Sequence, residues 1–206
     1  MKPSRVEIKV DYIPKEIRDK PRWICWRWEI RNEKWTKPPY NPNTLKFADS
    51  VDLKTWATFD KALSVYKSSY CDGIGFILAK EYTGIDFDDS RDPSNGQILE
   101  PALSEITKLN SYTEISPSLK GFKTLTKATL PKGGHHGEKI GAFNNGRYFC
   151  ITGHILPGIS SNIELRQLEI DNLVKRFWPD DFINEIEEHE YPQGGNENDD
   201  NIISRI

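Results

Sequence analysis

The stretch at residues 73–89 constrains the fold of this chain more than any other. It reads GIGFILAKEYTGIDFDD and predicts a hairpin of two short strands, the second carrying residues 85–89. Because strand side chains alternate between faces, Asp86 and Asp88 should share one face, and Ile85 and Phe87 the other. Two neighbouring carboxylates on an apolar strand indicate either a site for a divalent cation or an acidic strand end in water.

Composition and length restrict the class of protein. The chain has 206 residues, of which 36% are hydrophobic and 29% are charged, and this favours a globular domain with a polar surface. No apolar run approaches the roughly 20 residues that cross a bilayer, and the first residues lack the apolar core of a signal peptide. Cys25, Cys71 and Cys150 are far apart and should be reduced and buried. We therefore expect a cytoplasmic protein with no membrane segment.

The order of the predicted elements gives the fold class. Strands and amphipathic helices do not alternate regularly, and most consecutive strands are separated by turn residues, which favours an α+β fold with antiparallel pairs. The expected strands are 23–29, 34–37, 73–80, 85–89, 111–116, 122–129, 140–143 and 147–152. Turn residues at 32–33, 117–121 and 144–146 predict hairpins between the strands on either side of them. The expected helices are 52–67, 99–109 (with Leu99, Leu103, Ile106 and Leu109 inward), 165–177 and an acidic helix at 180–189.

Two loops carry side chains of chemical interest. Residues 38–43, PPYNPN, should form an extended loop, where Lys37 could meet a phosphate or be solvated. Residues 133–137 should form a flexible glycine-rich loop. Neighbouring side chains diverge, so His135 and His136 are poor joint ligands for a metal.

Charge is distributed unevenly along the chain. The formal net charge is -3, but residues 120–150 hold one acid, Glu138, against six basic residues: Lys120, Lys123, Lys127, Lys132, Lys139 and Arg147. Such a stretch can bind phosphates or be a solvated face.

An ordered set of motifs resembles one family. The motifs are WxWExRNxKWTKPPYNP, DxxTW, DGIGFIL, GIDFDD, SYTEISPSxKG and GRYFCITG, in that order. The chain resembles, over roughly residues 20–180, the N-terminal domain of phage and plasmid primase-polymerases of the archaeo-eukaryotic primase superfamily. The resemblance implies a bilobed fold with an RRM-like, mostly antiparallel catalytic sheet flanked by helices.

The resemblance also implies a reaction and its partners. Such domains join nucleoside triphosphates on a single-stranded DNA template with two Mg²⁺ or Mn²⁺ ions, and a helicase domain or partner often accompanies them. The metal-binding catalytic pair falls on Asp86 and Asp88.

Further site residues follow from the same motifs. Phosphate-binding positions fall on Ser116 and Ser118 of the SPS turn (residues 116–121), on Lys120 beside them, and on Arg147 of GRYF.

Two positions depart from the family pattern. Lys123 stands where the family has a histidine that contacts the triphosphate, and it can still bind phosphate through its charge. Gly141 stands where the family has the third metal-binding carboxylate. Glu138 should lie on the opposite strand face, and Glu114 is a substitute only if it faces the aspartate pair. Without the third carboxylate, we expect the loss of one metal ion and a large fall in the rate of nucleotidyl transfer. An activation barrier raised by about 4 kcal/mol would slow this reaction roughly a thousandfold.

Three functions remain open at this point. The chain is a nucleic-acid- and nucleotide-binding replication domain with weakened catalysis, an active primase-polymerase with a substitute acid, or a protein-docking module. We expect one domain over 1–190, with an N-terminal lobe at about 1–70, a catalytic sheet at about 71–160 and closing helices at about 165–189. Residues 191–206 read as a polar linker towards a further domain.

Overall fold

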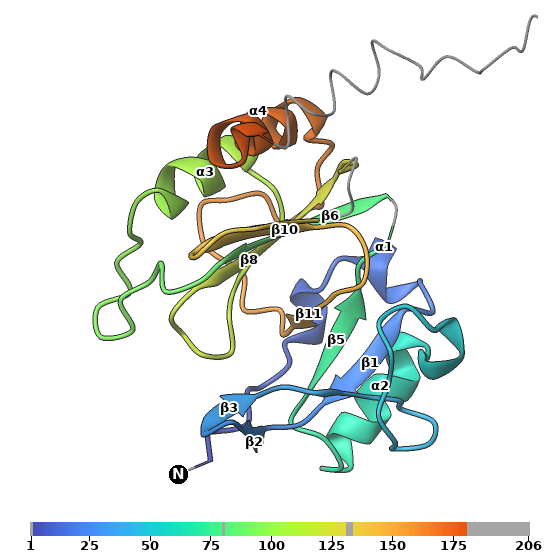
Figure 1. The fold of residues 1–206 in the computed structure, drawn as a ribbon. Helices are drawn as coiled ribbons and strands as arrows, with labels where there is room; N and C mark the ends of the chain where they lie inside the picture. Colours follow the sequence, from blue (N-terminus) through green and yellow to red (C-terminus); the bar gives the residue numbers. More distant parts are fainter. Residues whose placement is uncertain (1, 80, 131–133, 181–206) are drawn as a thin grey trace, which may run out of the picture.

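The computed structural model describes residues 2–79, 81–130 and 134–180. The fold is α+β with antiparallel sheets flanked by helices, as predicted (Figure 1). The helical elements are η1 (Val10–Tyr12), α1 (Lys15–Arg18), η2 (Leu53–Thr55), α2 (Phe59–Lys67), α3 (Ala102–Leu109) and α4 (Gln167–Phe177). The strands are β1 (Trp23–Trp26), β2 (Glu29–Arg31), β3 (Lys34–Thr36), β4 (Pro39–Tyr40), β5 (Gly73–Ile77), β6 (Tyr82–Phe87), β7 (Thr113–Ile115), β8 (Phe122–Lys127), β9 (Gly134–His136), β10 (Ile140–Phe143) and β11 (Tyr148–Ile151).

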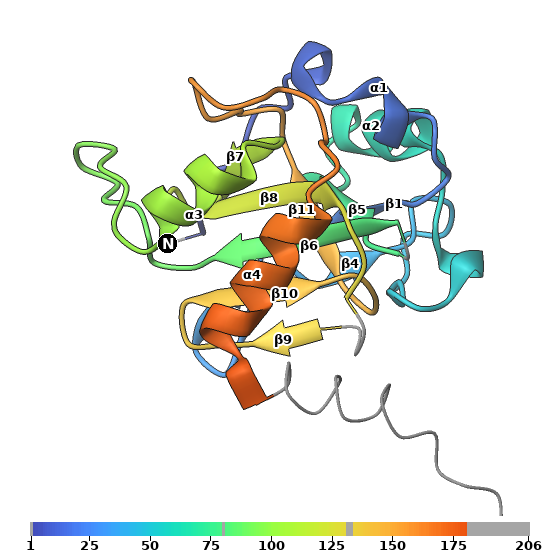
Figure 2. The same ribbon diagram turned by 90° about the horizontal axis from the view of Figure 1, so that it is seen from above.

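A five-stranded sheet carries the predicted acidic strand. Its order is β7-β8-β6-β10-β9, so β6 lies at the centre. Helices α3 and α4 cover one face (Figures 1 and 2). Ile85 and Phe87 of β6 point to this face and pack with Ile106 of α3 and Ile170 of α4. The Asp86 side chain, which alternates with Ile85 and Phe87 along β6, therefore points to the opposite face.

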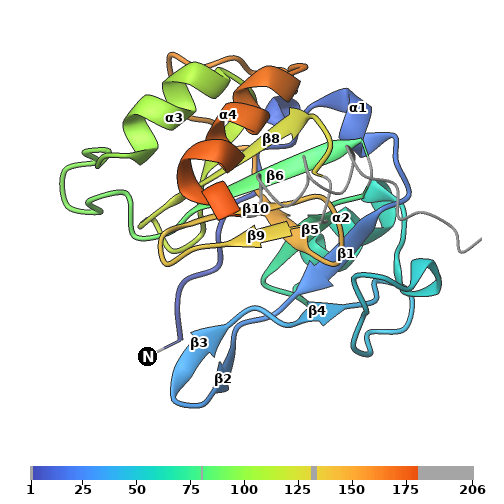
Figure 3. The same ribbon diagram turned by 45° about the horizontal axis from the view of Figure 1, so that its top comes forward.

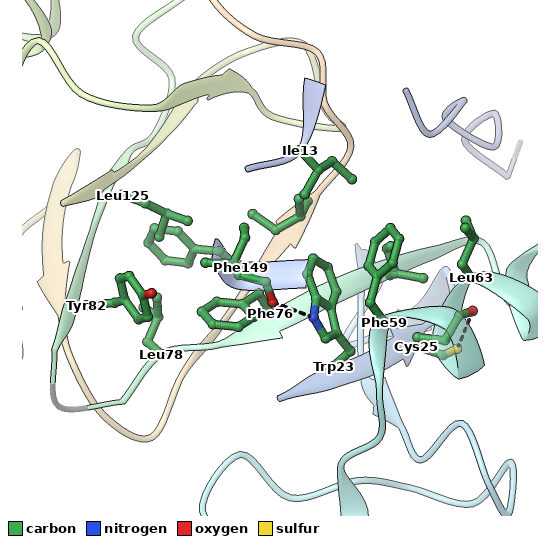
Figure 4. Close-up of a cluster of buried hydrophobic side chains, with 14 of the residues drawn as sticks. Ile13, Trp23, Cys25, Phe59, Leu63, Phe76, Leu78, Tyr82, Leu125 and Phe149 are labelled. Atoms are coloured by element: carbon green, nitrogen blue, oxygen red, sulfur yellow. Dashed lines mark hydrogen bonds between the residues drawn. The ribbon is translucent and has the colours of Figure 1, made fainter. Parts of the chain in front are cut away.

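A four-stranded sheet, in the order β11-β5-β1-β4, forms the second layer. Helix α2 packs on it, and the largest core cluster joins this sheet to the first one. Figure 4 shows Trp23 and Phe76 of this sheet beside Phe59 of α2, with Tyr82 and Leu125 approaching from the five-stranded sheet. The two sheets are thus held together by shared apolar packing.

Two predicted hairpins are wrong. Strands β5 and β6 do not pair, because β5 lies between β11 and β1 while β6 lies between β8 and β10. Strands β10 and β11 likewise belong to different sheets, although the turn between them has the expected positive φ at Gly146. Turn residues specify that the chain changes direction, but burial decides the partner. All residues of β5 are buried, which suits a central strand with two neighbours.

Other predicted strands and turns can be compared with the structure. The hairpins β2–β3 and β7–β8 are confirmed. The loop predicted at 133–137 is wrong at residues 134–136, because Gly134–His136 pair with β10 as an edge strand. Pro39–Tyr40 also form a short edge strand, where a proline does not break the ladder.

The helices differ in extent from the prediction. The helix predicted at 52–67 is divided into η2, capped by Asp52, and α2, capped by Thr58. Leu99 and Leu103 are exposed rather than inward. Leu99 precedes α3, which begins only after Pro101, and the buried face of α3 consists of Ala102, Glu105, Ile106 and Leu109. Residues 181–189 of the predicted acidic helix and the tail 191–206 lie outside the described residues.

Two expectations about burial and membranes can be compared directly. All three cysteines are free and buried, as predicted. Within the part of the chain that is described, none of the helices has the length and apolar character needed to cross a membrane.

Candidate nucleotide-binding site

A row of polar residues runs across one face of the five-stranded sheet. Directly paired positions follow one another from strand to strand in the order Glu114, Lys123, Asp86, Gly141 and His136. Side chains of paired residues lie on the same face of an antiparallel sheet. The sheet register therefore brings the predicted acid, both departures from the family pattern and the proposed substitute acid into one line.

Asp86 is neutralised by its neighbour in this row. The Lys123 ammonium lies 2.5 Å from Oδ1 of Asp86, and the two side chains are only 13% and 21% exposed. The same ammonium lies 4.8 Å from the centre of the Phe149 ring on β11. Lys123 is thus held between a carboxylate and an aromatic face, which makes it a resident counter-ion of Asp86.

Asp88 lies just past the end of β6. Its backbone N–H donates to the carbonyl of Lys139 at 2.8 Å, which extends the pairing with β10 and keeps Asp88 in alternation with Asp86. Loss of hydration and the charge of Asp86 raise the pKa of the Asp88 carboxyl, while Lys123 and Lys37 act in the opposite direction. The continued pairing with β10 agrees with the predicted shared face of Asp86 and Asp88.

The place of the third carboxylate is filled by an aromatic ring. A Cβ atom at Gly141 would stand 2.7 Å from two ring atoms of Phe143, and 3.5 Å from the carbonyl oxygen of His135. Phe143 is two residues along the same strand and therefore on the same face. A longer side chain at Gly141 would require this ring to move.

Glu114 is in the row, but its carboxylate is already bound. It accepts hydrogen bonds from the backbone N–H and hydroxyl of Thr152, both at 2.7 Å, from Gly153 N–H at 2.8 Å, and from the Tyr112 hydroxyl. Burial raises the pKa of Glu114, and these hydrogen bonds oppose that shift. Lys123 lies between Glu114 and Asp86 in the row. The role of Glu114 as a substitute ligand stays a prediction, and it would require these contacts to break.

The SPS turn closes the β7–β8 hairpin beside the end of β6. The hydroxyls of Ser116 and Ser118 lie 2.9 Å apart, and Ser116 N–H donates to the carbonyl of Gly121 at 2.9 Å. A Cβ atom at Gly121 would stand 2.2 Å from the Phe87 carbonyl oxygen, so only glycine allows this close approach. The backbone of the turn at Gly121 therefore lies against Phe87 and Asp88, and Lys120 beside it is exposed.

Arg147 lies at the other end of the row. Its guanidinium carbon is 5.1 Å from the centre of the Phe143 ring, and Nη2 lies 3.4 Å from Nε2 of His136. His136 makes an edge contact with the Phe143 ring, while His135 stacks on Trp178. The two histidines thus diverge, as expected for neighbours in a strand.

The residues present do not fit a pair of divalent ions. Two such ions lie about 3.5 to 4 Å apart and each needs several oxygen ligands, so a third carboxylate normally supplies part of the charge. Here Asp86 is paired with Lys123, and the ring of Phe143 covers Gly141. Within the described ranges, no group of three or more His, Cys, Asp or Glu side chains is placed to hold a metal ion.

Sequence reasoning missed three residues that shape this site. Phe143 and Phe149 appear in the sequence only as apolar strand residues, and their contacts with Gly141 and Lys123 depend on rotamers that a motif does not encode. Arg91 stabilises the SPS turn, because its guanidinium donates to the carbonyl of Leu119 at 2.9 Å. Its position in a loop rich in turn residues gave no signal of this contact.

A comparison with known proteins agrees with the motifs. No family model matches the sequence. The chain is 33% identical over 145 residues to the DNA Primase-polymerase of Nitratiruptor phage NrS-1. The matched stretch covers 66% of this chain. The match spans 20% of the length of that phage protein, so the activity of the whole phage protein is not assigned to this chain. The similarity supports a primase-polymerase domain in the matched part of this chain.

Proposed function

We propose that this domain binds single-stranded DNA and nucleoside triphosphates within a phage or plasmid replication protein, and that its template-directed nucleotidyl transfer is weakened or lost. The observation that carries this proposal is the ion pair of Lys123 with Asp86, next to a Gly141 that lies beneath the Phe143 ring. An internal ammonium ion replaces part of the positive charge that a divalent cation would bring.

The site residues favour phosphate binding over metal binding. Four cationic side chains, Lys37, Lys120, Lys123 and Arg147, belong to the site or its rim, against the two aspartates. The SPS turn adds two hydroxyls that can hold phosphate oxygens. Phosphate binding of this kind is electrostatic, so affinity for single strands should fall as salt rises.

A second candidate is an active, metal-dependent primase-polymerase. The similarity to a protein named DNA Primase-polymerase favours it. In this case another acid, Glu114 among them, would complete the site in a rearranged state. In either case the domain would act in the cytoplasm, and a helicase domain or partner would open the template.

A binding experiment tests the shared part of both candidates. Fluorescence anisotropy with a labelled single-stranded oligonucleotide should show binding at low salt that weakens with added salt. Replacing Lys120 and Arg147 by Met should weaken binding, whereas Lys15→Met, a change at an exposed lysine that pairs only with Asp19, should not. Lack of affinity for both the strand and nucleoside triphosphate at low salt would instead favour a protein-docking module.

A primer-extension experiment separates the two candidates. A labelled primer on a single-stranded template is incubated with nucleoside triphosphates and Mn²⁺, with the matched Asp86→Ala variant as the control. Weakened catalysis predicts little or no growth of the primer. Robust growth that stops in the Asp86→Ala variant would refute the proposal and establish the active form.

A further inference from the structure

A pocket of about 460 Å³ lies next to the SPS turn. Three parts of the chain line it: residues 3–6 of the N-terminal segment, the β2–β3 region with Trp28, Trp35 and Lys37, and residues 117–119 of the turn. Ser118 therefore belongs to both the pocket and the candidate site. The charge of Lys37 acts on Asp88, which connects the pocket to the acidic strand. The volume is within the usual range for small-molecule sites.

Trp28, one of the residues that line this pocket, carries an unsatisfied hydrogen-bond donor. Its side chain is buried, with the residue 7% exposed, and Nε1 finds no acceptor among the residues that the structure describes. Four other indole N–H groups each donate to a carbonyl oxygen at 2.8 to 3.0 Å, namely those of Trp23, Trp26, Trp56 and Trp178. Buried polar groups are nearly always paired, so the orphaned donor indicates a place for an acceptor from a ligand.

Lys37 supplies a positive charge beside this donor. Its ammonium lies 4.7 Å from the centre of the Trp28 ring, and it forms no ion pair with any described residue. The Tyr148 hydroxyl donates to the Lys37 carbonyl, which fixes the main chain of Lys37 to β11. An anionic ligand would find this charge already in place.

The walls of the pocket are fixed by contacts within the chain. Asp72 accepts the backbone N–H of Trp28 at 2.7 Å and pairs with the ammonium of Lys2 at 2.9 Å. The Tyr66 hydroxyl donates to the carbonyl of Val6 at 2.8 Å. These contacts hold the N-terminal segment on the domain, so the pocket is formed before a ligand binds.

We propose that this pocket binds the base of a nucleotide whose phosphate lies against Lys37 and the SPS turn. A nucleotide combines the three features that the lining demands: a flat ring for Trp35, an acceptor for the indole N–H of Trp28, and a negative charge for Lys37. The inference rests on the proposed nucleotide-binding function and adds a base-binding part to it. The nucleotide is either a free triphosphate or one unit of a single strand.

The test compares ligands with and without a base. Isothermal titration calorimetry without divalent ions measures the affinity of the protein for dATP and for inorganic triphosphate. The variants are Trp35→Ala, which removes the ring, and Trp28→Phe, which removes only the N–H. Trp56→Phe is the matched control, because Trp56 lies outside the pocket and its N–H donates to the Asp49 carbonyl.

The expected result is a gain in affinity that requires both the base of the ligand and the side chains of the pocket. Stacking of one base is worth between about fivefold and a hundredfold in affinity, so dATP should bind more tightly than inorganic triphosphate by such a factor. Trp35→Ala should bring the ratio of the two affinities, dATP over inorganic triphosphate, close to one. Trp28→Phe should lower this ratio severalfold. Binding of inorganic triphosphate, and all binding by Trp56→Phe, should stay as in the unmodified protein.

A second pair of ligands identifies the source of the base. An oligothymidine and an abasic strand of the same length are compared with the same variants. If Trp35→Ala changes only the dATP ratio, the pocket takes a free nucleotide, and if it changes only the strand ratio, the pocket takes a unit of the strand. Equal binding with and without a base, or a base preference that both variants retain, overturns the inference while nucleotide binding stands. Absence of binding by every ligand overturns the proposed function as well.

Discussion

Replacing Lys123 with methionine should make this site bind a divalent cation more tightly. The Lys123 ammonium lies 2.5 Å from Oδ1 of Asp86, where it competes with any cation for the same oxygen. Methionine removes the charge while keeping an unbranched side chain that can pack against the Phe149 ring. The change therefore tests whether the internal cation is what keeps the site from holding a metal.

The magnitude follows from the geometry of the ion pair. A cation bound about 2.1 Å from the same oxygen would lie at most about 4.6 Å from the ammonium. The repulsion between charges of +2 and +1 at that distance is about 2 kcal/mol in bulk water and about 7 kcal/mol at an effective dielectric constant of 20. Because both side chains are less than a quarter exposed, the water value is a lower bound. The dissociation constant for Mn²⁺ should then fall at least roughly twentyfold.

Calorimetric titration with Mn²⁺ at low ionic strength measures this change. Lys127→Met is the matched control, because Lys127 is on the same strand but pairs with Glu16 at 2.8 Å. Adding Asp86→Asn to Lys123→Met should remove the gain if the ion binds to Asp86. An affinity of Lys123→Met within twofold of the unmodified protein, or an equal gain in the Lys127 control, would refute the reasoning.

Two further predictions concern the supports of the site. Glu114→Gln should lower the free energy of unfolding by about 1–3 kcal/mol near pH 5, because its amide would face the Gly153 N–H donor. Since burial raises the pKa of Glu114 above 4.5, the unmodified protein should lose stability as the pH rises through the folded-state value. In urea titrations, the difference in unfolding free energy between the unmodified protein and Glu114→Gln should therefore narrow as the pH rises through that value. A difference that does not change with pH would contradict this prediction. Gly121→Ala should cost about 1–3 kcal/mol or more and weaken triphosphate binding, because the new Cβ would stand 2.2 Å from the Phe87 carbonyl. Unchanged unfolding and binding curves would show that the turn can move freely.

The sequence alone determined the local features of this domain. The alternation that separates Asp86 from Ile85 and Phe87 depends only on strand geometry, and the structure confirms it through the core beneath β6. The motif set predicts a primase-polymerase domain, and the similarity to the phage protein supports it. Short turns such as residues 32–33 also fix their hairpin, because both residues adopt the positive φ that the turn requires.

Only the tertiary structure decided which strands are partners and what fills the site. The turn before β11 looks like a hairpin turn, but burial of Phe149 and Ile151 in the second layer draws that strand to β5. The state of the site depends in the same way on contacts between residues distant in sequence. The Phe143 ring lies over Gly141, and the Lys123 ammonium lies between Asp86 and Phe149. Backbone preferences act over a few residues, whereas these contacts arise from packing two sheets together, so a sequence pattern could identify Asp86 and Asp88 but not their surroundings.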